Sequence, residues 1–443
     1  MTRQTVWKAA LAAAFTVSAL LPAFAAAPQA PANLTSGALA GGGQYVISHT
    51  EIAPVAAIAL WYRAPSSGFD AAGVPGLGRL AAATVAGSAP ITGTPLGRYV
   101  SDLGGRIAIS TYPDSIAISV LVPAEDAASI VHAMTVSFFA PVVTADGLKL
   151  AQRDVGEEAF FRQFNSEQTI DDALVGSLFS DGPEHFPSLG PSADVSKITL
   201  DQVKAYAQRA FRSSNAVLVV TGAVDASVIA TAVPGRTDSS PHPEPPAAAH
   251  LVPEPQPVAT TGVEPGQGLG WVGPAITSER EATALDFISD YLFRPDTGVV
   301  QRDLGTTKAT VSGKFVTYHD PGVLLVTISG GDVAAARMVV DDALAAVRKP
   351  LERATFAAAR DAFLYHMLSD IETPGGMADT LGWYTVEGNQ AYAPGLGGMS
   401  SRYFEIASSL TPAFVAATVN KYLSRPGAIV AVDAAKKAEN TSK

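Results

Sequence analysis

The histidines are the residues whose chemistry can be judged from spacing alone. A zinc site on a helix needs two imidazoles at positions i and i+4, which share one helical face, with a glutamate beside them to activate the bound water. No two histidines of this chain lie four or five residues apart, and there is no cysteine to act as a ligand. We therefore predict no metal centre and no cofactor. The chain has seven histidines, at His49, His132, His185, His242, His250, His319 and His366.

Other side chains that could do chemistry form weaker patterns. His366 and Asp370 are spaced i, i+4 on an expected helix, which fits a metal pair but is common by chance. His242 and His250 lie in a proline-rich stretch with no scaffold to bring ligands together. The glycine-rich segment 395–398 follows no clear strand and is interpreted as a loop. The sequence contains no Gly-x-Ser-x-Gly motif, which is the pattern that would indicate a serine nucleophile.

The first 25 residues, 1–25, are typical of a cleaved signal peptide. Arg3 and Lys8 supply the positive start, residues 9–21 are apolar, and residues 23–25 fit a small-x-small cleavage site. The apolar run is too short for a membrane span, which needs about 20 apolar residues. No later segment is long and apolar enough either. We expect a periplasmic or secreted protein with no membrane span after signal cleavage.

Charge and cysteine content exclude several classes of protein. The formal net charge is −11, and an acidic chain repels phosphate backbones, so nucleic-acid binding is not expected. Without cysteine there are no disulfides and no thiolate chemistry, so stability must come from packing.

The chain divides into two halves of domain size. After a flexible lead, 26–42, we expect a first lobe over 43–233. Residues 234–260 are dominated by Pro, Ala, Ser and Glu, which is typical of an extended linker of the polyproline type. A second lobe follows over 261–435, with a polar tail at 436–443. Each lobe has a length that suits one domain.

The two lobes end in the same pattern, which indicates a duplication. In the first, an amphipathic helix over 199–211 is followed by an apolar strand over 216–221. In the second, a helix over 411–423 precedes a strand over 428–432. Both halves mix helices with paired strands, so we predict a duplicated α+β fold.

Within the first lobe, alternating and β-branched residues predict strands. Residues 44–48 and 55–63 are expected to form a β pair, and 106–111 and 115–121 a second pair around a Pro-Asp turn. The Ala-rich segment 77–86, led by a glycine turn, is expected to be a helix.

Three segments carry a resemblance to a known family. "GVPGLGRLAAATVAG" at 73–87, "RDVGEEAFFRQFNSEQ" at 153–168 and the helix–strand–Gly stretch at 187–225 resemble the M16 (pitrilysin or mitochondrial processing peptidase-like) metallopeptidases. The resemblance covers nearly the whole mature chain. It implies an α+β fold of two homologous LuxS/MPP-like lobes joined by the Pro-rich linker.

The resemblance also implies where a zinc site would lie, and the residues there cannot form one. The positions that match His-x-x-Glu-His are Arg79, Ala82 and Ala83, which offer a cation and two methyl groups. The distal ligand position falls at Glu157, and one carboxylate alone cannot hold catalytic zinc. We expect no catalytic residues here. A salt bridge from Arg79 to Glu157 or Glu158 is expected to fill the position.

Members of this family often work as pairs of one metal-bearing and one metal-free subunit, in which the second half of the metal-free subunit grips the substrate. The matching positions are Arg302 and Lys308, the latter where the family has a tyrosine. The resemblance implies a non-catalytic, peptide-binding subunit of a periplasmic zinc peptidase that acts with a zinc-bearing M16 partner. A stand-alone peptide-binding or scaffold protein and a hydrolase with unrecognised residues are the alternatives.

Overall fold

The computed structural model describes residues 34–39, 41–88, 93–233, 249–253, 256–388 and 401–434. The elements up to residue 233 are β1 Leu34–Ala38, β2 Gln44–His49, β3 Val55–Tyr62, α1 Leu77–Gly87, α2 Leu96–Asp102, β4 Arg106–Thr111, β5 Ile116–Pro123, η1 Ala124–Asp126, α3 Ala127–Phe139, α4 Ala145–Arg162, α5 Ser166–Leu178, η2 Pro183–His185, α6 Ser192–Val195, α7 Leu200–Ala210, η3 Ser213–Asn215, β6 Ala216–Gly222 and α8 Ala226–Ala232. The remaining elements are β7 Val258–Gly262, β8 Gly266–Val272, α9 Glu279–Phe293, α10 Val299–Asp303, β9 Thr310–Val316, β10 Val323–Ser329, α11 Val333–Val347, α12 Arg353–Asp370, α13 Pro374–Val386, α14 Arg402–Ser409, α15 Pro412–Tyr422 and β11 Ala428–Ala434.

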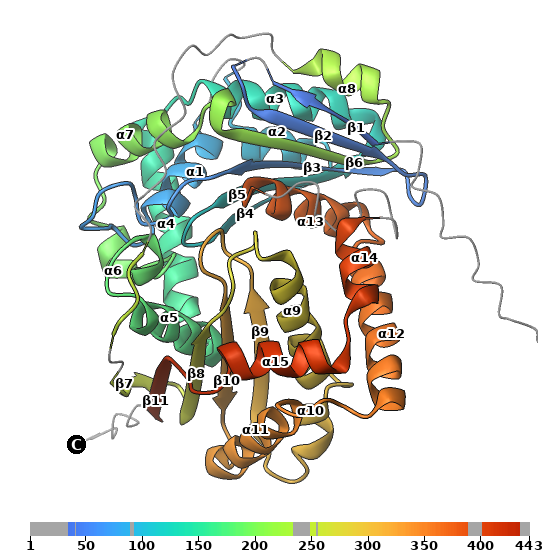
Figure 1. Cartoon of the computed structure of the whole chain (residues 1–443). Coiled ribbons are helices and arrows are strands. Elements are labelled where there is room, and N and C mark those ends of the chain that lie inside the picture. Colours follow the sequence, from blue (N-terminus) through green and yellow to red (C-terminus); the bar gives the residue numbers. More distant parts are fainter. Residues whose placement is uncertain are drawn as a thin grey trace, which may run out of the picture.

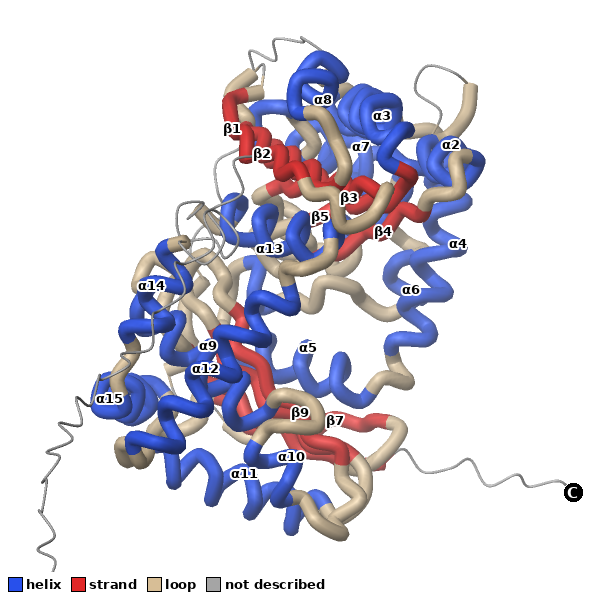
Figure 2. The backbone as a smooth tube through the Cα atoms, turned by 90° about the vertical axis from the view of Figure 1, so that its right-hand side faces the viewer, coloured by secondary structure: helices blue, strands red, loops and turns tan. Residues whose placement is uncertain are grey.

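Two sheets with the same connectivity confirm the duplicated α+β fold. The first sheet has the order β1-β2-β6-β3-β5-β4 and the second β7-β11-β8-β10-β9. Matching β2, β6, β3, β5 and β4 to β7, β11, β8, β10 and β9 superposes the two orders, with β1 as an extra edge strand. Even the single parallel pairing inside each repeat, β2 with β6 and β11 with β7, recurs. Figures 1 and 2 show the two sheets one above the other.

The strands over 44–48 and 55–63 form as expected but do not pair with each other. β6 lies between them, parallel to β2 and antiparallel to β3. All seven residues of β6 are buried, so this continuously apolar strand takes the centre of the sheet. Sequence pattern alone predicts strands more securely than it predicts which strands are neighbours.

Each lobe contributes a helix that covers the sheet of the other lobe. α5, from the first half of the chain, packs on β8, β10 and β11 of the second sheet. α13, from the second half, packs on β3 and β6 of the first sheet. In Figure 1 the green α5 lies against the second sheet and the orange-red α13 lies beneath the first. The lobes therefore share buried cores in addition to their covalent connection.

Small residues on the strands let these exchanged helices approach closely. Gly266, Gly268 and Gly270 alternate along β8, so they share one face of the strand. A Cβ placed on Gly268 would lie 2.5 Å from Ile170 and 2.9 Å from Leu174 of α5. The alternating glycines thus make room for the side chains of the helix that the first lobe contributes.

Several segments differ from the sequence expectations. Residues 34–38 of the expected flexible lead form β1, and β7 begins inside the expected linker because it pairs in parallel with β11. The helices that were not predicted from the sequence are α6, α8, α10, α13 and α14. Backbone pairing and tertiary packing order these stretches despite weak local patterns. The signal peptide 1–25, the polar tail 436–443, His242, segment 395–398 and most of the linker 234–260 lie outside the described residues.

Local helix signals agree with the structure. Thr199 caps α7 with a capping box, in which its hydroxyl accepts from the Gln202 N–H and the Gln202 side chain accepts from the Thr199 N–H.

None of the helices in the described parts of the chain has the length and apolar character that crossing a bilayer requires.

Candidate functional site

The positions that resemble a zinc-binding helix lie on α1. The turn before it is made by glycines, and Gly76 at the N-cap has φ of 87°, a conformation that side chains disfavour. Ala82 is completely buried in the core of the first lobe, and Ala83 is partly buried beside it. Arg79 is the only long polar side chain of the three, and it reaches toward α4, which packs against α1.

The expected salt bridge at this place is confirmed, and its partner is Glu158. The Arg79 Nη2 donates to Glu158 Oε2 at 2.5 Å and Nε donates to Oε1 at 3.3 Å. The Arg79 side chain is 17% exposed and that of Glu158 44%. Glu157, where the resemblance placed the distal ligand, is exposed, and no contact of its carboxylate with the described residues is seen. Neighbouring helix positions point apart, so only one of the two glutamates faces α1.

At the positions that resemble a zinc-binding helix, the contact seen between described side chains is the ion pair of Arg79 with Glu158. Across the described residues, no three His, Asp or Glu side chains are placed so that they could hold a metal ion. Each nitrogen of the Arg79 guanidinium that faces α4 meets a carboxylate oxygen, which is the two-point geometry arginine favours.

Breaking this pair should cost little stability. Arg79→Ala and Glu158→Gln should each lower the free energy of unfolding by about 0.5–1 kcal/mol, because the pair is partly exposed. The matched control is Glu157→Gln, which should leave stability unchanged. Urea denaturation of the single and double variants gives the coupling energy. A coupling between Arg79 and Glu157 that exceeds that with Glu158 would contradict the assignment.

The first sheet ends in a free strand edge next to this helix. Among the described strands, β4 is the outermost of this sheet and pairs only with β5. Its six residues alternate between exposed and partly buried, so one face of the strand is open to solvent. An outer strand with unpaired backbone groups can accept an extended peptide as a further strand.

Arg302 and Lys308 lie elsewhere, on the second lobe. Arg302 is exposed in the last turn of the short helix α10, and Lys308 is exposed in the loop before β9 with φ of 57°. α10 lies at the end of the second lobe that points away from the first (Figures 1 and 2). The structure therefore does not bring these two residues together with Arg79. Arg302 and Lys308 can therefore contact a substrate only if it lies against this outer surface of the second lobe.

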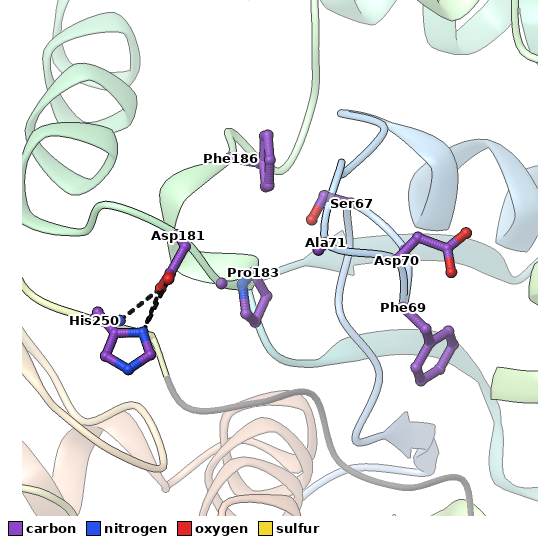
Figure 3. A pocket seen from close by; sticks show the side chains of 10 residues that line it. Ser67, Phe69, Asp70, Ala71, Asp181, Pro183, Phe186 and His250 are labelled. Carbon is purple, nitrogen blue, oxygen red and sulfur yellow. Dashed lines mark hydrogen bonds and ion pairs between the residues drawn. The ribbon is translucent and has the colours of Figure 1, made fainter.

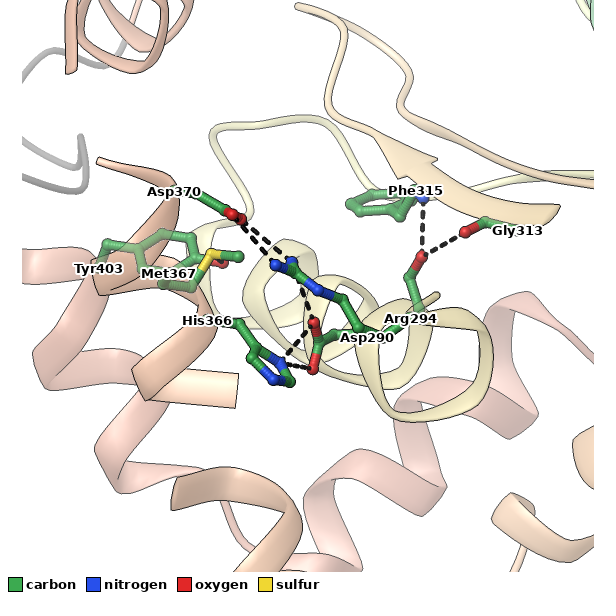
Figure 4. A network of polar contacts seen from close by, with 9 residues as sticks. Asp290, Arg294, Gly313, Phe315, His366, Met367, Asp370 and Tyr403 are labelled. Atoms are coloured by element: carbon green, nitrogen blue, oxygen red, sulfur yellow. Dashed lines mark hydrogen bonds and ion pairs between the residues drawn. The ribbon is translucent and has the colours of Figure 1, made fainter. Parts of the chain in front are cut away.

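His366 and Asp370 are both engaged by other side chains, so they do not form a metal pair. His366 Nδ1 lies 2.9 Å from Asp290 Oδ2, and Asp370 accepts from both terminal nitrogens of Arg294 at 3.1 and 3.2 Å. Figure 4 shows Arg294 between the two carboxylates, with His366 on the far side of Asp290. This network joins α9 to α12 within the second lobe.

His250 fixes a short stretch of the linker region to the first lobe. Its N–H donates to Asp181 Oδ1 at 2.8 Å and its Nδ1 lies 2.9 Å from Oδ2, which holds the pKa of Asp181 below its usual range. Both residues line a cavity of about 180 Å³ together with Ser67. In Figure 3 Ser67 lies across the cavity from His250, and no hydrogen bond joins them. The three residues therefore do not form a catalytic triad.

A group of buried carboxyls between the lobes was not foreseen from the sequence. Glu387, at the end of α13, is completely buried, and Asp114, in the turn between β4 and β5, is nearly so. Burial, then the charge of Asp114, raises the pKa of Glu387 well above its usual value. His319 joins them, since its N–H donates to Asp114 and its Nδ1 lies 2.8 Å from the Glu387 carbonyl oxygen. Isolated acidic residues in turns carry no pattern that would reveal such a meeting.

Comparison with known proteins identifies the fold and one homologous segment. Residues 197–362 match the family model described as the peptidase M16 inactive domain. This segment of the chain is homologous to that domain. The sequence match runs from α7 into α12, and a solved structure with the same fold covers 90% of the chain. No curated protein matches the sequence significantly.

Three bacterial structures share this M16 fold at low sequence identity. A protease from Helicobacter pylori has a TM-score of 0.78 at 17% identity, covering 90% of this chain and 99% of that one. A protein described as an M16-like peptidase from Alicyclobacillus acidocaldarius has a TM-score of 0.73, and a peptidase M16 inactive domain from Pseudomonas fluorescens 0.70. Each of these two is 17% identical and covers 92% of this chain and 99% of its own. The predicted resemblance to M16 proteins is thus confirmed in sequence for residues 197–362 and in fold for the chain that these structures cover.

Proposed function

We propose that this chain is the non-catalytic, peptide-binding subunit of a periplasmic M16-type zinc peptidase and acts with a zinc-bearing partner subunit. The observation that carries the proposal is the state of the α1 positions in an otherwise intact M16 fold. Glu158 neutralises the charge of Arg79, and Ala82 is buried in the core. These positions can therefore neither bind a zinc ion nor activate a water molecule bound to it. The match to an inactive M16 domain supports the same conclusion.

Peptide binding does not require the metal. A strand added to the edge of β4 would be held by backbone hydrogen bonds, which depend weakly on sequence. The two lobes and the helices they exchange hold that edge in a fixed frame. Arg302 and Lys308, exposed on the outer surface of the second lobe, are available to a substrate that is bound on the partner subunit. The signal peptide expected over 1–25 supports the periplasmic location.

The experiment combines the purified chain with a zinc-bearing M16 protein from the same genome, sought first among the genes next to that of this chain. We expect a stable complex on gel filtration and a higher peptidase rate than the partner has alone. The isolated chain should bind peptide without turnover, and a peptide methylated on alternate backbone nitrogens should bind more weakly. The control is the same peptide methylated outside the bound segment.

Two outcomes separate the alternatives. Peptide binding with no complex and no gain in rate would favour a stand-alone peptide-binding protein. Stoichiometric zinc in the isolated chain, or turnover that a chelator abolishes, would overturn the proposal.

A further inference from the structure

A second cavity, of about 380 Å³, lies between the lobes and has aromatic walls. Tyr112, directly after β4, contributes from the first lobe, and Phe315, Trp383, Tyr384 and Tyr403 contribute from the second. Tyr112 and Trp383 meet edge to face, with ring centroids 4.7 Å apart. Aromatic faces of this kind attract both apolar stems and cations.

One carboxylate in this cavity has no cation beside it among the residues that the structure describes. Asp286 of α9 accepts a hydrogen bond from the Tyr403 hydroxyl at 3.0 Å through Oδ2. The other two charged residues of the lining are already paired. Lys314 is 2.5 Å from Asp171, and Asp370 is 3.1 Å from Arg294 (Figure 4). Among the described lining residues, Asp286 alone thus lacks a salt-bridge partner.

The surroundings of Asp286 favour a cationic guest. The residue lies deep in the fold but remains partly accessible, because it faces the cavity. Burial, followed by the charge of Asp290, raises its pKa to about 7, although the Tyr403 hydrogen bond opposes the shift. A positive group bound against it would restore the ionised form and gain strength from the low local dielectric.

The geometry favours an ammonium over a guanidinium group. Tyr403 already occupies Oδ2, which leaves one oxygen for the guest, so the carboxylate cannot form the two-point contact that arginine prefers. An ammonium on a short apolar stem meets one oxygen as a point charge while its stem lies against the rings.

The cavity is also placed where a bound peptide would end. β4 runs from Arg106 to Thr111, and the next residue, Tyr112, already lines the cavity. A strand added to the edge of β4 therefore has one end beside the cavity opening. This step rests on the proposed function, because it takes the ligand to be a peptide held on that edge.

We propose that this cavity is a subsite for a primary ammonium group of the bound peptide, with Asp286 as its counterion and the aromatic side chains around its stem. A lysine side chain and a free amino terminus both supply this chemistry, and the experiment separates them.

The test measures the affinity of matched peptides by titration calorimetry at pH 8. One peptide has an acetylated amino terminus and one lysine, a second has norleucine in place of lysine, and a third has norleucine with a free amino terminus. We expect the lysine or the free amine to tighten binding by at least about tenfold over the peptide that has neither. Asp286→Asn should abolish that difference and leave the uncharged peptide unaffected. The matched control is the exposed Asp342→Asn on the same lobe.

The pH dependence gives a second readout. Binding of the preferred cationic peptide to the wild-type chain should weaken as pH falls from 8 to 5.5, because Asp286 becomes protonated. Other titratable groups face it: Tyr403 on α14, Asp290 on α9, Asp370 on α12 and Lys314 on β9. The part of the pH dependence that Asp286→Asn removes is therefore the part due to Asp286.

Equal binding of charged and uncharged peptides to the wild-type chain would overturn this subsite and leave the proposed peptide-binding function intact. No binding of any peptide would overturn both. Because the peptide comparison needs no substitution in the protein, a folding defect in Asp286→Asn cannot hide the result.

Discussion

Gly382→Ala is expected to destabilise the folded chain by about 2 kcal/mol, because it overpacks the contact between α13 and the first sheet. A Cβ at this position would lie 1.9 Å from Nε1 of Trp61. Trp61 is buried and cannot move aside, since Tyr112 stacks on it at 6.0 Å and Trp383 meets it edge to face at 6.1 Å. The substitution acts on the helix that the second lobe contributes to the first.

The matched control is Gly375→Ala on the same helix. Its Cβ would meet nothing within 4 Å, so the gain in helix propensity should leave the chain unchanged or stabilise it by up to about 1 kcal/mol. Urea denaturation followed by tryptophan fluorescence measures both variants. If the two alanines have the same effect, Trp61 does not form the close contact that holds α13 on the first sheet.

The sequence predicted those parts of the fold whose signal is local. The strand at 216–221, the capping box at Thr199 and the repeated helix–strand ending all depend on neighbouring residues, and each is found where expected. The exchange of α5 and α13 between lobes could not be predicted, because it depends on small residues of one half meeting a helix of the other. Hydrophobic periodicity shows that a helix has an apolar face and does not show which sheet will cover it.

The same division applies to the candidate site. Loss of the metal ligands is visible in the residue types at Arg79, Ala82 and Ala83, and the replacement salt bridge follows from opposite charges on two packed helices. Whether Glu157 or Glu158 faces Arg79 depends on how α4 is rotated about its axis. The spacing between the motif positions does not fix that rotation to within one residue. Asp286 carries no motif, and its setting becomes evident only when five aromatic side chains from four separate segments line the cavity that it faces.

Glu184→Gln should make the chain more stable than the wild type above pH 7 and nearly equal to it below pH 4.5. Glu184 is 5% exposed, and its Oε2 has no hydrogen-bond partner within the described residues. Burial, then the charges of Asp114, Asp320 and Asp181, raises its pKa to about 7 from the ordinary 4.5. The folded chain therefore holds this proton more tightly than the unfolded chain does.

This raised pKa fixes the sign of the pH effect. Its contribution to stability is fully present below pH 4.5 and is lost as pH rises through 7, which amounts to about 3 kcal/mol across the shift. Glutamine keeps the shape and cannot ionise, so the variant should lose that part of the slope. A slope should remain, because burial also raises the pKa of Asp171 to about 6 and that of Asp286 to about 7.

Urea denaturation from pH 4.5 to 8.5 measures the difference in stability between Glu184→Gln and the wild type, with Glu125→Gln, at an exposed position, as control. Parallel stability curves for Glu184→Gln and the wild type would show that Glu184 reaches solvent in the folded chain, and would contradict its burial.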